Sequence, residues 1–118
     1  MLLAVPAAPT RYRNKHIVID SLDGPLILDL DGIRLYRGDE EVALTITEFL
    51  ILGTLAEQAG AAVEQRLLLR AASRLKHPLH RRNLPPHIRR LRTKIEVDPS
   101  QPALLKTVRG YGYRLDVR

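Results

Sequence analysis

The sequence contains no cysteine among its 118 residues. A disulfide framework and a thiolate metal site are therefore excluded, and the absence fits a cytosolic protein. No apolar run approaches the roughly 18 residues that a membrane-spanning helix needs. The chain also has no phosphate-binding glycine loop and no nucleophile elbow, and its acidic residues gather in expected turns. We therefore predict neither an enzyme nor a bound cofactor.

The composition is that of one globular domain, with 45% apolar residues, 27% charged residues and a mean hydropathy of −0.14. The opening residues, MLLAVPAAP, lack the basic start and the uninterrupted apolar stretch of a signal peptide, so we expect a cytoplasmic protein. Residues 1–15 lack periodicity and contain Pro6 and Pro9. We interpret them as a linker or disordered lead-in, and residues 16–118 as the folded domain.

Basic charge is concentrated in one half of the chain. Residues 1–62 hold five Lys/Arg and nine Asp/Glu, a net charge of −4, whereas residues 63–118 hold fourteen and four, a net charge of +10. A concentrated basic field attracts a polyanion, because it releases the counterions that phosphates hold. Charge alone leaves open the alternative of a solvated basic surface.

Short apolar runs separated by Asp/Gly turns occupy residues 16–44. The runs are HIVIDSL, PLILDL, GIRLYRG and EVAL, and the turns are at residues 23–24, 31–32 and 38–39. This pattern predicts a small antiparallel sheet.

The pattern changes to a helical period at Thr45, where Thr45 and Glu48 have the spacing of a capping box. The predicted first helix ends at Gly60 and has five apolar positions on one face: Phe49, Leu52, Leu55, Ala56 and Ala59. A short second helix is expected over residues 64–73, with a buried face formed by Leu68, Leu69 and Ala72.

A third helix is predicted within NLPPHIRRLRTKI, residues 83–95. Its apolar residues recur at helical spacing and should face a core: Leu84, Ile88, Leu91 and Ile95. Arg89 and Arg90 then point mostly to the opposite face, and Arg92 lies on the flank. A guanidinium-rich face on a core-anchored helix indicates an anionic partner.

The chain ends with ALLKTVRGYGYRLDV, in which two short strands flank RGYG. Gly110 and Gly112 are expected to supply the positive φ angles of a tight hairpin. Strand alternation places Tyr113 in the core, and Tyr111 is expected to be exposed. The order of sheet, three helices and C-terminal hairpin predicts an α+β winged helix-turn-helix.

Three segments resemble the C-terminal effector domain of OmpR/PhoB-type response regulators: LTITEF (44–49), HIRRLRTKIE (87–96) and DPSQPALLKTVRGYGYRL (98–115). The resemblance covers about residues 17–117. It implies a winged-helix, sequence-specific regulator of transcription that binds double-stranded DNA in a two-component system. In this family the third helix is the recognition helix, which enters the major groove, and the hairpin is a wing that enters the minor groove.

The resemblance also implies site residues. Arg90 is expected to contact a base, because Arg can present two donors to guanine, while Arg89 and Arg92 contact phosphates or neighbouring base edges. Arg109 at the wing tip would enter the minor groove and Thr107 would contact a phosphate. The full predicted DNA-binding set is Arg82, Asn83, His87, Arg89, Arg90, Arg92, Thr107 and Arg109.

Several positions depart from the family pattern. Glu64-Gln65 replace a frequent Ser-Arg at the start of the second helix, and Ser73 replaces an aromatic residue at its end. The loop at residues 74–83, which relatives use to contact RNA polymerase, is basic here, so it would contact either polymerase or DNA. The receiver domain of such regulators has no room in these residues, so a longer parent carries it or the chain is a single-domain relative. Relatives also bind direct-repeat half-sites in tandem, which implies a monomer that pairs on DNA.

Pro85 and Pro86 stand where relatives have residues inside the recognition helix. Because Pro86 disfavours helical angles at the residue before it, we predict that the helix begins near Pro86 and that Leu84 lies outside it.

Two other interpretations of this region compete with DNA binding. His77, His80 and His87 suggest a metal site, but no cysteine accompanies them and the surrounding cations oppose a metal ion, so none is predicted. The alternative function is a winged-helix protein-interaction module or a non-specific nucleic-acid binder.

Overall fold

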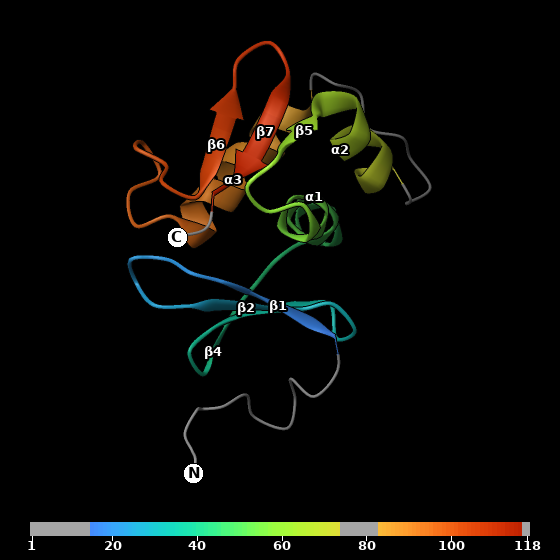
Figure 1. Cartoon of the computed structure of the whole chain (residues 1–118). Coiled ribbons are helices and arrows are strands. Elements are labelled where there is room, and N and C mark those ends of the chain that lie inside the picture. Colours follow the sequence, from blue (N-terminus) through green and yellow to red (C-terminus); the bar gives the residue numbers. More distant parts are fainter. Residues whose placement is uncertain (1–14, 74–82, 117–118) are drawn as a thin grey trace.

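The structure is a computed structural model, and it describes residues 15–73 and 83–116. The chain forms a four-stranded sheet, then two helices with a short strand between them, then a third helix and a C-terminal hairpin. Figure 1 shows the four-stranded sheet on one side of helix α1 and the hairpin on the other. The prediction of an α+β winged helix is confirmed.

The N-terminal sheet is antiparallel, with the strands in sequence order. Its strands are β1 (His16–Ile19), β2 (Leu26–Asp29), β3 (Arg34–Arg37) and β4 (Glu40–Val42). Leu26, Leu28 and Leu35 are fully buried, so the face that carries them covers the helices. The predicted Asp/Gly turns connect the strands, although the positive φ of the second turn, 58°, belongs to Ile33.

Helix α1 (Ile46–Glu57) begins with the predicted capping box. Thr45 Oγ1 accepts a hydrogen bond from the amide of Glu48, and Glu48 Oε1 accepts one from the amide of Thr45. Four of the five predicted apolar positions are buried, but Ala59 is exposed. The helix stops at Glu57, earlier than predicted, and residues 58–60 form a turn in which Gly60 has a φ of 87°.

Helix α2 (Gln65–Ala72) directly follows a strand that the sequence pattern did not reveal, β5 (Ala62–Glu64). Leu68 and Ala72 are buried and Leu69 is partly buried, as expected for its apolar face. Glu64 occupies the N-cap position without a side-chain capping hydrogen bond, which agrees with the departure from the family's Ser-Arg pair.

The C-terminal hairpin consists of β6 (Leu105–Val108) and β7 (Gly112–Leu115), and β5 pairs with β7 on its other edge. Gly110 has the predicted positive φ, 76°, but Gly112 does not. Gly112 is required for a different reason: a Cβ there would lie 2.0 Å from the Val63 carbonyl oxygen. The prediction for Gly112 was therefore wrong, because the close pairing of β5 with β7, rather than the turn, demands glycine.

Helix α3 spans Leu84–Ile95, with both prolines inside its first turn and Leu84 fully buried. The predicted start near Pro86 is therefore wrong. The first four amides of a helix have no intrahelical partner, so prolines there cost no hydrogen bond. Burial of Leu84 in the core outweighs the weaker preference of pre-proline residues for extended angles.

Candidate nucleic-acid interface

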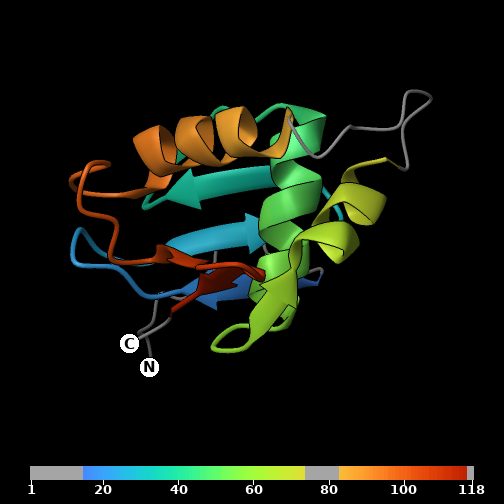
Figure 2. The same cartoon turned by 90° about the horizontal axis from the view of Figure 1, so that it is seen from above.

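Helix α3 separates apolar and basic residues onto two faces. The predicted stripe is buried: Leu84, Ile88, Leu91 and Ile95 are each at most 1% exposed. Arg89 and Arg90 are exposed on the other face, and Asn83 is exposed at the N-cap. Figure 2 shows α3 crossing one end of α1, with which it is in contact. The core therefore fixes the helix in an orientation that presents its arginines to solvent.

Arg90 lies beside a buried carboxylate from another helix. Its Nε is 3.5 Å from Glu48 Oε2, and Lys94 Nζ is 2.5 Å from Glu48 Oε1. The Glu48 side chain is fully buried, whereas 53% of the Arg90 side chain is exposed. Within the described residues, Glu48 Oε2 is a buried oxygen that accepts no hydrogen bond. The charge of Arg90 therefore compensates an oxygen whose hydrogen bonding is otherwise incomplete.

Burial would raise the pKa of Glu48, but the hydrogen bonds from Lys94 and Thr45 and the charges of Lys94 and Arg90 outweigh it. The net pKa of Glu48 lies below its ordinary value, so this carboxylate is ionised at neutral pH. Burial, and then the charge of Arg90, lower the pKa of His87, while Glu48 raises it less. A neutral His87 can accept through Nδ1 from Arg90 Nη2, which lies 2.9 Å away.

Arg92 connects α3 to the hairpin. Its Nε donates to the carbonyl oxygen of Leu105 at 2.9 Å, and its Nη2 donates to Thr107 Oγ1 at 2.9 Å. Two residues predicted to contact DNA, Arg92 and Thr107, are thus bonded to each other in the free protein. The helix and the wing are held together on the surface that should face DNA.

The tip of the wing is exposed at Arg109, Gly110 and Tyr111, and Tyr111 is 48% exposed. Tyr113 is partly buried and packs against the core, as strand alternation predicted. The amide of Tyr111 closes the turn by donating to the carbonyl of Val108 at 2.9 Å. Arg109 at this tip is exposed, as insertion into a groove requires.

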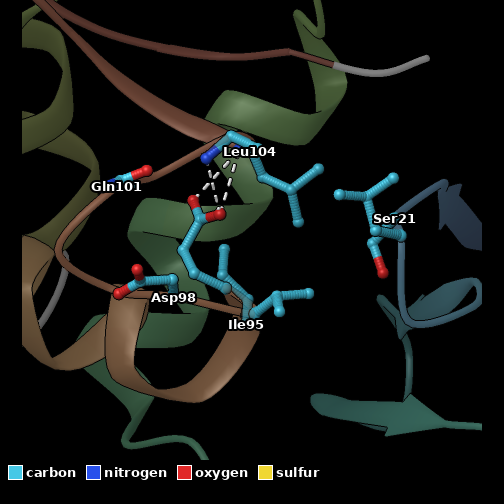
Figure 3. Close-up of a pocket in the computed structure, with 9 residues that line it drawn as sticks. Ser21, Ile95, Asp98, Gln101 and Leu104 are labelled. Carbon is cyan, nitrogen blue, oxygen red and sulfur yellow. Dashed lines mark hydrogen bonds between the residues drawn. The ribbon is translucent and has the colours of Figure 1, made fainter.

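The start of the wing is anchored by Glu96, directly after α3. Its carboxylate accepts from the amides of Ala103, Leu104 and Leu105 at 2.7–3.1 Å. Figure 3 shows these bonds at Leu104, beside a pocket of about 240 Å³ that also contacts Ser21. Arg37 Nη2 donates to the carbonyl of Ile95 at 3.1 Å and so ties β3 to the end of α3.

Some predicted features fall on residues outside those described. These are Arg82 of the predicted DNA-binding set, the basic loop with His80 and Arg81, and two of the three histidines considered as metal ligands. Residues 1–14 of the predicted lead-in also lie outside them, whereas the Lys15 amide donates to Asp31 Oδ2 at 2.9 Å. Across residues 15–73 and 83–116, no three His, Asp or Glu side chains are grouped as a metal site. No helix in those ranges is both long and apolar enough to cross a bilayer.

Sequence reasoning missed the role of Glu48 beside the basic face. The capping-box pattern identified this residue as a helix cap, and the structure confirms that role. The same side chain also reaches Arg90 and Lys94, which lie 42 and 46 positions later in the chain. The available signal was the four-residue spacing of those two cations on one helix face, which a single buried anion can bridge.

Residues 39–115 match the family described as "Transcriptional regulatory protein, C terminal". The chain is 37% identical over 93 residues to the transcriptional regulatory protein AfsQ1 of Streptomyces coelicolor, an alignment covering 79% of this chain and 41% of that protein. It is 39% identical over 97 residues to the protein PetR of Rhodobacter capsulatus, covering 78% and 41%. The chain thus spans about two fifths of the length of these relatives.

Solved structures share the fold. The DNA-binding domain of RstA from Klebsiella pneumoniae, in complex with the RstA box, matches with a TM-score of 0.72 and 30% identity, over 87% of this chain and 98% of that one. The response regulator DrrB of Thermotoga maritima, described as an OmpR/PhoB homologue, matches with a TM-score of 0.70 and 33% identity, over 84% and 44%.

Proposed function

The chain belongs to the family of C-terminal domains of transcriptional regulatory proteins, of the OmpR/PhoB response-regulator type, and on that premise we propose that it binds specific sites in double-stranded DNA. Helix α3 enters the major groove and the wing tip enters the minor groove. The family is one of transcription factors, not of enzymes.

One observation carries this proposal: two exposed basic elements are held in a fixed relation to each other. Arg89 and Arg90 project from α3, and Arg109 projects from the wing. The bonds from Arg92 to Leu105 and Thr107 join the two elements. A rigid pair of this kind can contact the major and the minor groove at the same time. Contacts to base edges then specify the sequence, while contacts to the DNA backbone set the register.

The position and existing bonds of each predicted residue indicate its role on DNA. Arg90 would contact a guanine edge through its outer nitrogens, and Arg89 would contact phosphate. Arg109 would enter a narrow A·T-rich minor groove. Asn83 at the helix N-cap and Thr107 on β6 are exposed and would contact the DNA backbone. For Arg92 we propose mainly a tethering role, because two of its nitrogens already donate to β6.

The decisive experiment is a selection of bound duplexes from a random pool, followed by competition. The selected duplex should compete for the protein far better than a scrambled duplex, double-stranded RNA or heparin at the same salt concentration. Equal competition by all four would refute sequence-specific recognition and favour a non-specific nucleic-acid binder. A selection that recovers no consensus would have the same meaning.

Partners beyond one DNA site are also proposed. The complex of the RstA domain with its box supports binding to DNA, and the small size of one helix and one wing supports weak binding by a single copy. We propose that the free chain is monomeric and that two copies bind direct-repeat half-sites cooperatively, in the cytoplasm. Moving the half-sites apart by half a helical turn should abolish cooperativity; unchanged cooperativity, or a stable dimer without DNA, would refute this arrangement.

Two further partners are proposed, and one of them is a second domain of a longer protein. The curated relatives are more than twice as long as the matched segment, which supports a receiver domain in a longer parent. The basic loop at residues 74–83 is proposed to contact RNA polymerase or DNA.

A further inference from the structure

We infer that Glu48, a residue of α1 that lies behind the basic face, determines specificity by holding Arg90 in position to contact a base. This inference rests on the proposed function, and Glu48 itself touches no DNA in it. Glu48 acts through Arg90, so it is a positioning residue.

The two oxygens of the Glu48 carboxylate have different partners. Glu48 Oε1 is occupied by two donors, the Thr45 amide at 2.9 Å and Lys94 Nζ at 2.5 Å. Glu48 Oε2 accepts no hydrogen bond from the described residues, and Arg90 Nε is 3.5 Å from it. A fully buried charged oxygen in this state attracts a nearby cation, and Arg90 places its Nε 3.5 Å from it.

Protein groups hold one side of the Arg90 guanidinium. Glu48 faces the Nε of the guanidinium, and His87 Nδ1 lies 2.9 Å from Nη2. Among the contacts of the described residues, none involves Arg90 Nη1. The inner side of the guanidinium is therefore held by protein groups, while the outer side remains available for the two acceptors of a guanine edge.

Holding Arg90 in place also changes the free energy of binding. A free arginine side chain samples many rotamers and must be ordered when it binds. An anchor that restricts the side chain beforehand reduces this cost only for the contact that uses the restricted geometry. Glu48 also places a negative charge behind the basic face, which lowers attraction to phosphates of any sequence. Both effects raise the ratio of specific to non-specific affinity.

The test is Glu48→Gln in the 118-residue chain, because glutamine can still cap the helix from this position. The ratio of affinities for the selected duplex and a scrambled duplex should fall about three- to tenfold, the range for losing the restriction of one side chain. Affinity for the scrambled duplex should stay equal or rise. Glu57→Gln is the matched control: it makes the same change at the other end of α1, where Glu57 is exposed and pairs with Lys15, and it should leave the ratio unchanged.

A double-mutant cycle separates positioning from a general structural role. In an Arg90→Ala background, Glu48→Gln should change the ratio less than about twofold, because the side chain it positions is gone. Additive effects, or equal losses for selected and scrambled duplexes, would overturn the inference.

Two further outcomes are informative. If the wild-type chain selects a consensus and Glu48→Gln keeps the wild-type ratio, the inference fails and the proposed function stands. If the wild type selects none, both fail. A measurement on the unaltered protein guards against an unfolded variant: the Nε–H of Arg90 should be more ordered than that of Arg89 in the free protein by NMR relaxation, and equal disorder of the two would also overturn the inference.

Discussion

Replacing Glu96 with alanine should destabilise the domain by removing the acceptor for the start of the wing. Glu96 is only 8% exposed, and its carboxylate accepts from the amides of three consecutive residues, Ala103, Leu104 and Leu105. Each buried donor left without a partner costs about 1–3 kcal/mol. Three such donors together set an upper limit on the loss of stability, and other effects reduce that loss.

Two effects lower the net cost. The pocket beside Glu96 is open to solvent, so water can reach some of the amides. Removing a buried carboxylate also removes its own desolvation penalty. We therefore expect Glu96→Ala to lower the free energy of unfolding by about 2–4 kcal/mol. Glu96→Gln should lose much of the same stability, because its NH₂ group would face backbone donors.

The assay is guanidinium unfolding at pH 7, with hydrogen exchange at residues 103–105 as a local readout. Asp98→Asn is the control, because Asp98 is exposed and, among residues 15–73 and 83–116, its carboxylate bonds only to nearby Ser100. Its midpoint should stay close to that of the wild type. A loss below about 1 kcal/mol for Glu96→Ala, with unchanged exchange at the three amides, would refute the reasoning.

Three other perturbations have clear expected results. Gly112→Ala should cost about 3 kcal/mol or more in urea unfolding, because its Cβ would lie 2.0 Å from a β5 carbonyl; Gly53→Ala, where the nearest atom is 3.9 Å away, should stabilise α1 by up to about 1 kcal/mol, and equal effects would contradict this. The pKa values of His87 and Glu48 are both lowered by folding, so stability should decline as pH falls below about 6.5 and again below about 4.5, the ordinary values. His87→Gln should flatten the first decline and Glu48→Gln the second in midpoint-against-pH curves, and unchanged curves would show that neither group contributes. Arg109→Ala should weaken the preference for A·T-rich flanks in a flank-substitution binding series, and a uniform loss across flanks would show a phosphate contact only.

The order of elements was predictable because local patterns specify it. Alternating apolar runs, the capping box at Thr45 and the stripe from Leu84 to Ile95 are all short-range signals, and each matches an observed element. Strand β5 was not predicted because three residues are too few to show an alternating pattern, and its pairing partner lies about 50 positions later, on β7. The same pairing explains why Gly112 was assigned to the wrong cause.

The start of α3 shows where local preference is outweighed. Pre-proline residues favour extended angles, which predicted a start near Pro86. Complete burial of Leu84 contributes on the order of 2 kcal/mol, more than a conformational preference of this kind, so the helix extends back to Leu84. A local rule could not include that burial, since the core that covers Leu84 is built from distant segments.

Counting basic residues on α3 overstates the charge that this helix can present to DNA. Lys94 and Arg90 share the buried carboxylate of Glu48, and Arg92 donates to β6. Arg89, by contrast, is exposed and forms no ion pair with the other described residues. A cation that is already bonded to protein groups is restricted in direction, so it suits a base contact, which requires a defined geometry. A side chain without such bonds suits a phosphate, which requires only charge and reach. The different roles proposed for Arg90 and Arg89 therefore depend on α1 as much as on α3. No pattern within the recognition helix alone could have revealed this difference.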